Sequence, residues 1–198
     1  TVPCAQTVPP GDAPAEAIRV AVEDGAWAVE DVAAVGPGDG LDVLWEDDDV
    51  LVIYQGGASG TRVCAPSDLV VARRSAAYVP QVLVASSADA PSTVPYSTDG
   101  DVVGDYPAAG LLAGDLVVAY GDTHFGYTRD DFERADLEVF RAGAAEVVDA
   151  ATGSGVANAL ALGGGGEVAV AFANLSGSGP DQFGVWLATL EEERALAL

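Results

Sequence analysis

One strand pattern occurs three times along this chain of 198 residues. Each copy starts with four aliphatic residues followed by an aromatic one, continues through a polar stretch and ends in a second apolar run. Runs this short, bounded by Gly, Asp and Ser, predict β-strands rather than helices. The first runs are 50–54, 116–120 and 168–172, and the second runs are 69–72, 137–140 and 185–188.

The repeat extends further towards the N-terminus in each copy. An apolar segment and a tight turn precede the first run, and another strand precedes that segment, which predicts a meander of four consecutive antiparallel strands. The triplet Asp47, Asp48 and Asp49 occupies one of these turns, and its equivalents carry no such triplet, which favours a hairpin over a metal site. The apolar segments are 41–45, 108–112 and 157–162, and the leading strands are 27–32, 78–85 and 145–150.

Units of four strands and about 40–50 residues have the size of propeller blades. One small sheet cannot bury both of its faces, whereas stacked sheets cover each other and leave only short edges. The prediction is therefore an all-β, propeller-like array of three four-stranded antiparallel blades plus one extra N-terminal strand that begins at Ile18. The predicted segments are an extended N-terminus 1–17, a repeat domain 18–190 with units 18–26, 27–75, 76–143 and 144–190, and a C-terminal tail 191–198.

Three blades and one strand do not make a closed ring, because propellers carry about four to eight blades. Two interpretations follow from this count. In one, the chain is a fragment or processed piece of a larger ring. In the other, a protein partner or a second copy of the chain completes the ring.

A family resemblance rests on motifs in the second unit. Val103-Gly104-Asp105-Tyr106-Pro107 precedes the strand 116–120, and Gly121-Asp122 and later Asp136-Leu137 follow it. With these motifs, residues 18–190 resemble the blade repeats of sialidase-type propellers in bacterial surface and secreted proteins. The resemblance implies blade geometry and no particular activity.

The repeats differ from one another at the motif positions. The third unit lacks Tyr-Pro, and the first has Gln55-Gly56 in place of Gly121-Asp122, so a ligand role for Asp122 does not extend to every unit. A sialidase-like enzyme would need an arginine cluster and a Tyr–Glu nucleophile pair. The sequence reveals neither, and we predict no catalytic residue.

The charge balance restricts the partners of the chain. There are 31 acidic and 8 basic residues, a formal net charge of −23 at pH 7. This charge argues against nucleic acids and anionic membrane surfaces, because both are bound by clustered cations. No apolar run approaches the length that spans a bilayer. The charge is compatible with high solubility, cation binding or a basic partner.

The chain contains no Met, and residues 1–17 lack the features of a signal peptide, so we expect a mature secreted or surface protein. Its two cysteines are too few for a disulfide scaffold and lack zinc-site spacing. In an oxidising compartment we expect a disulfide between Cys4 and Cys64, which lie in comparable loops. A bond to another segment or chain, and free thiols, are the alternatives.

We predict that the segment 121–136 is one loop, and it contains the only His of the chain and five carboxylates. One interpretation is a Ca²⁺ site formed by Asp122, Asp130, Asp131 and Asp136, because Ca²⁺ prefers several hard oxygen ligands. The other is a solvated loop with internal Asp–Arg pairs. The further candidate ligand-binding residues of this loop are His124, Tyr127 and Arg129.

The sequence thus favours a non-enzymatic secreted module that binds a protein or a polysaccharide, or that assembles into a larger complex. A glycan-active, sialidase-like hydrolase fragment is one alternative, and a structural subunit of an extracellular filament is another. Trp27, Trp45 and Trp186 fall on predicted strands, and we expect them to pack in the core or between blades.

Overall fold

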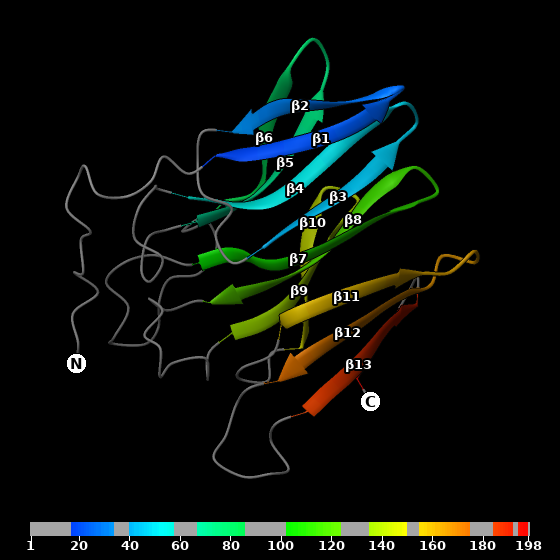
Figure 1. Ribbon diagram of the computed structural model, residues 1–198. Coiled ribbons are helices and arrows are strands. Elements are labelled where there is room, and N and C mark those ends of the chain that lie inside the picture. The colour runs from blue at the N-terminus through cyan, green and yellow to red at the C-terminus, as the bar shows by residue number, and fades with distance from the viewer. Residues whose placement is uncertain are drawn as a thin grey trace, which may run out of the picture.

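The computed structural model describes residues 17–33, 40–57, 67–85, 102–123, 135–149, 155–174, 184–191 and 194–197. Within these ranges every regular element is a β-strand (Figure 1), which confirms the predicted all-β class. The same ranges contain no helix that could cross a membrane.

The strands follow one another along the chain with no other element between them in the described ranges. They are β1 (Ile18–Asp24), β2 (Ala26–Ala33), β3 (Leu41–Glu46), β4 (Asp49–Gly57), β5 (Ser67–Arg74), β6 (Tyr78–Val84), β7 (Val102–Leu112), β8 (Asp115–Thr123), β9 (Ala135–Arg141), β10 (Ala144–Asp149), β11 (Val156–Leu162), β12 (Val168–Asn174), β13 (Gly184–Glu191) and β14 (Arg194–Ala197).

Consecutive strands pair as antiparallel meanders. β1 pairs with β2, and three four-stranded meanders follow: β3 to β6, β7 to β10 and β11 to β14. A single parallel residue pair, Ser67 with Val102, links the first two of these meanders into one eight-stranded sheet. Figure 1 shows the meanders as successive layers from β1 and β2 to β11–β13. None of them closes on itself among the described strands.

The meanders group the strands one position later than the predicted units. The sequence pattern suggests that β6 and β10 open new units, whereas they pair with β5 and β9 and end the preceding meander. The turns explain the difference. Ala142 and Gly143 join β9 to β10 with φ angles of 50° and 82°, as a two-residue hairpin requires. By the same logic β1 and β2 match the third and fourth strands of a meander, so the N-terminal piece is a strand pair rather than one lone strand.

The three four-stranded meanders share one strand register. In each of them the aromatic residue that ends the apolar run of the second strand lies opposite the equivalent position of the third strand. These opposed pairs are Tyr54 with Val70, Tyr120 with Glu138, and Phe172 with Trp186.

Both faces of the inner meanders are buried. In β4, Leu51 and Ile53 pack towards β7–β9, whereas Val52 and Tyr54 pack towards β1 and β2. The next interface repeats this arrangement, because residues of β8 and β9 such as Val139 pack against β12 and β13. Strands covered on both sides explain why these runs are apolar at nearly every position.

The tryptophan prediction is wrong. Trp27, Trp45 and Trp186 are 69%, 60% and 43% exposed. Trp27 lies on the outer face of β2, and Trp45 lies on the face of β3 that looks towards β1 and β2. That neighbour contributes two strands rather than four, so it covers β4 and β5 but leaves the β3 side chains exposed.

The layered packing generates a stability prediction for two valines of different burial. Val139 is 0% exposed between two meanders, and Val79 is 58% exposed on β6. We expect Val139→Ala to lower the free energy of unfolding by about 1–3 kcal/mol through lost burial and a new cavity. Val79→Ala should change it by less than about 0.5 kcal/mol. Urea denaturation followed by circular dichroism measures both, and equal effects would contradict the assigned packing.

Candidate functional site

The two ends of the meanders differ. At one end, here called the turn end, tight turns join β1 to β2, β3 to β4, β5 to β6, β7 to β8 and β9 to β10. At the opposite end, here called the loop end, the longer connections leave and enter the strands. These connections are 34–39, 58–66, 86–101, 124–134, 150–154 and 175–183, and their structure lies outside the described residues.

Buried polar side chains gather where strands reach the loop end. Gln55 near the end of β4 donates through Nε2 to Asp105 Oδ1 at 2.6 Å and to Ser67 Oγ at 2.9 Å. Ser67 Oγ in turn donates to the Val103 carbonyl at 3.1 Å. Because Gln55 and Ser67 belong to one meander and Asp105 to the next, these bonds fix the two meanders to each other. They lie beside the parallel pair of Ser67 and Val102.

A second polar group lies between β8 and β9. The Tyr120 hydroxyl donates to the Glu138 carboxylate, and both side chains are buried. Nearer the loop end, Asp122 lies directly opposite Asp136 in the strand register. Asp122 is buried and Asp136 is half-buried, so the strands present these two carboxylates close to the point where segment 124–134 begins and ends.

Two glycines allow the last two meanders to approach closely at the same end. A Cβ added to Gly121 would lie 2.7 Å from the Gly155 carbonyl oxygen, and one added to Gly155 would lie 2.6 Å from the Asp136 carbonyl oxygen. Asn158 Nδ2 donates to the carbonyls of Tyr106, at 3.1 Å, and Gly155, at 2.9 Å. The loop end is thus held by backbone contacts and hydrogen bonds between meanders.

The predicted site residues fall into two groups. The structure brings Asp122 and Asp136 together, and among the residues that it describes no group of three or more His, Cys, Asp or Glu side chains could hold a metal ion. The Ca²⁺ site and the disulfide stay predictions, because their remaining members lie outside the described residues. Those members are Asp130 and Asp131 for the Ca²⁺ site and Cys4 and Cys64 for the disulfide, and the candidate ligand-binding residues His124, Tyr127 and Arg129 also lie outside the described residues.

Sequence reasoning missed the hydrogen bonds of Gln55 and the Tyr120–Glu138 pair. The second pair could have been found, since the repeat alignment places Glu138 where the other copies have Val70 and Trp186. A carboxylate at a position that is otherwise apolar needs a buried partner. The bond from Gln55 to Asp105 gave no such signal, because it joins residues 50 positions apart in different meanders.

Two of the described tyrosines, Tyr54 and Tyr78, have pKa values that the fold shifts. Burial raises the pKa of Tyr54 above its ordinary value of 10.0. Burial also raises the pKa of Tyr78; the nearby Glu30 carboxylate adds to this shift and the Arg74 guanidinium opposes it. The net effect at both phenols favours the protonated form.

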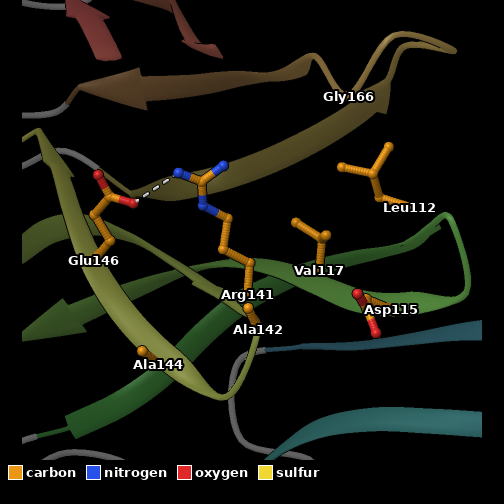
Figure 2. A pocket seen from close by; sticks show the side chains of 8 residues that line it. All are labelled: Leu112, Asp115, Val117, Arg141, Ala142, Ala144, Glu146 and Gly166. Carbon is orange, nitrogen blue, oxygen red and sulfur yellow. Dashed lines mark hydrogen bonds and ion pairs between the residues drawn. The ribbon is translucent and has the colours of Figure 1, made fainter. Parts of the chain in front are cut away.

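A separate pocket lies at the turn end, between the meander β7 to β10 and the meander β11 to β14 (Figure 2), with a volume of about 400 Å³. Its arginine, Arg141, forms an ion pair with Glu146 at 3.3 Å, and Asp115 adds a second carboxylate. This balance gives the pocket no net attraction for an anion. Its lining residues are Leu112, Asp115, Val117, Arg141, Ala142, Ala144, Glu146 and Gly166.

Comparison with known proteins gives no family for this chain: no family model, no curated protein and no solved structure matches it.

The Gln55–Asp105 bond generates a pH-dependent prediction. Gln55→Glu keeps the shape of the side chain but places a second carboxylate against Asp105, which we expect to cost about 1–3 kcal/mol of stability at pH 7. Like charge raises the pKa of one carboxyl in the folded state, so the penalty should shrink as pH falls below about 5. Denaturation at pH 7 and pH 4 measures this change.

Gln81→Glu is the matched control. Gln81 is exposed and accepts a 3.4 Å bond from Arg73 Nη1, so the same substitution should be neutral there. A pH-independent loss in Gln55→Glu would contradict the contact between Gln55 and Asp105.

The glycine contacts generate a second prediction at the loop end. Gly155 has a φ of 80° and no room for a Cβ, so Gly155→Ala should lower the unfolding free energy by about 1–3 kcal/mol. Gly164 has nothing within 4 Å of an added Cβ, and Gly164→Ala should have little effect. Thermal denaturation of both variants tests this difference, and an undisturbed Gly155→Ala protein would refute the close approach.

Proposed function

We propose that this chain is an extracellular, non-enzymatic module of propeller type that binds a protein or polysaccharide through its loop end. One observation carries the proposal: the strand ends that the longer connections between β2 and β13 join all lie at that end, where buried polar side chains gather. Loops on a rigid sheet scaffold are the usual place for binding residues.

The contacts of the first strands support a propeller-type arrangement. β7 contacts β3 on one side and β11 on the other, whereas the outer strands β6 and β10 make little contact with each other. The Asp42 carboxylate accepts a hydrogen bond from the Ala109 amide at 2.7 Å, and Asn158 binds the Tyr106 carbonyl on the other side. Sheets that meet along their first strands and spread outwards have the geometry of neighbouring blades.

The non-enzymatic assignment rests on the positions of the polar groups. The Tyr120–Glu138 pair superficially matches the nucleophile pair of a sialidase, but Tyr120 is 0% exposed, so no substrate reaches it. Arg73, Arg74 and Arg141 lie within the last two positions of their strands at the turn end, and they form ion pairs with Glu46, Glu30 and Glu146. These arginines do not form a carboxylate-binding cluster at the loop end.

The charge indicates what kind of partner fits. With a net charge of −23, the chain repels polyanions, so a neutral polysaccharide or a basic protein is the expected ligand. The extracellular location rests on the sequence alone, chiefly on the two cysteines, which we expect to form a disulfide in an oxidising compartment.

A retention assay on immobilised cellulose, chitin and dextran, and on cytochrome c as a basic protein, tests this function. We expect the unchanged chain to be retained on at least one probe. Replacing 126–133 by a Gly-Ser segment of equal length should weaken that retention at least about tenfold, since loops carry the binding residues. The paired change Asp47→Asn and Asp48→Gly at the turn end is the control and should leave retention unchanged.

Three results would contradict the proposal. The first is no retention of the unchanged chain on any probe. The second is retention that is lost in the turn-end control and kept in the loop variant. The third is release of reducing sugar that is abolished by Asp122→Ala, which would favour the hydrolase alternative.

A further inference from the structure

The outer face of the last meander is apolar and uncovered by any described strand. We call this surface, formed by alternate residues of β11, β12 and β13, the rear face. Val185 is 82% and Leu187 is 47% exposed. Its members from Ala159 to Leu187 carry no charge, and Thr189 and, at the last position of β13, Glu191 continue the same alternation. The remaining small residues of the rear face are Ala159, Ala161, Ala169, Ala171 and Ala173.

The same positions are interfaces in the two preceding meanders. Leu187 pairs with Ala171 as Val71 pairs with Ile53 and as Val139 pairs with Ala119, so these positions are equivalent in register. Val185 is equivalent in the same way to Leu69 and Leu137. The equivalents of Val185 and Leu187 in the earlier meanders are all 0% exposed beneath the next meander; they are Leu69, Val71, Leu137 and Val139.

A second uncovered face lies at the other end of the stack. We call the outer side of β1 and β2, which presents Ala21, Trp27 and Val29, the front face. Trp27 is 69% and Val29 is 67% exposed. The charges of this face are a mutual pair, Arg19 with Asp31 at 2.8 Å, and Glu23 next to the β1–β2 turn. Its large side chains complement the small alanines of the rear face.

We infer that the rear face binds the front face of a second copy of this chain. Inside the chain, every meander packs one face on the opposite face of the next, always in the same direction. Continuing that direction from one molecule to another joins rear to front, which is a heterologous contact that closes into a ring or extends as a filament. The inference concerns the ends of the stack, so it holds or fails independently of ligand binding at the loop end.

Charge sets the conditions for this association. Each copy carries a net charge of −23, so two copies repel each other at low ionic strength. Salt screens this repulsion and leaves the largely apolar rear face free to bind, so association should become tighter as salt rises.

Sedimentation velocity of the 198-residue chain over a concentration series, at low and high salt, tests the inference. Val185→Glu blocks the rear face, and Trp27→Glu blocks the front face. Each should weaken self-association by about a hundredfold or more, because an unpaired carboxylate is costly to bury. Val79→Glu, at a residue 58% exposed on β6, is the matched control and should associate like the unchanged chain.

Mixing the two blocked variants reveals the direction of the contact. Each retains one intact face, so an equimolar mixture of Val185→Glu and Trp27→Glu should form a dimer that neither forms alone. Circular dichroism confirms that each variant is folded, and Leu187→Glu provides a second rear-face block.

Three outcomes would overturn the inference. The unchanged chain could stay monomeric at every concentration and salt. Trp27→Glu could associate normally while Val185→Glu does not, which would indicate two rear faces in contact. All variants could associate alike, which would place the contact elsewhere.

Discussion

The fold depends on side chains that pack on both faces of the second strands. Along β4 and β8 successive residues point alternately to the preceding and the following meander, and nearly all of them are buried. A small meander exposes two faces to water, and only a neighbour on each side removes that cost. The layers therefore stabilise one another, and no single meander among those described has a core of its own.

This dependence explains which parts of the fold the sequence predicts. Continuous apolar runs predict strands that are buried on both faces, and this applies to 50–54, 116–120 and 168–172. The registers of these runs agree residue by residue. The grouping of strands was harder to predict, because a hairpin turn and a link between meanders can both be rich in small residues. Ala142 and Gly143 form a hairpin turn because both adopt left-handed φ angles, and amino-acid composition does not specify these angles.

The candidate site was predictable only in part. Asp122 and Asp136 follow from strand register, since each stands at the loop end of paired strands. The bond between Gln55 and Asp105 follows from packing between meanders, which no local pattern encodes. The exposure of the tryptophans could not be predicted either, because aromatic residues on strands usually pack inward. Trp45 is exposed because the neighbouring sheet has two strands rather than four.

The shared register also bears on how such a chain can change length. Val117 and Ala119 of β8 hold the same positions as Leu51 and Ile53 of β4, on the same side of their strands. A gene segment encoding one whole meander could be duplicated or deleted, and the newly adjacent faces would still be apolar and in step. Growth by whole layers is then tolerated far better than insertion of a single strand, which would reverse the direction of every strand after it.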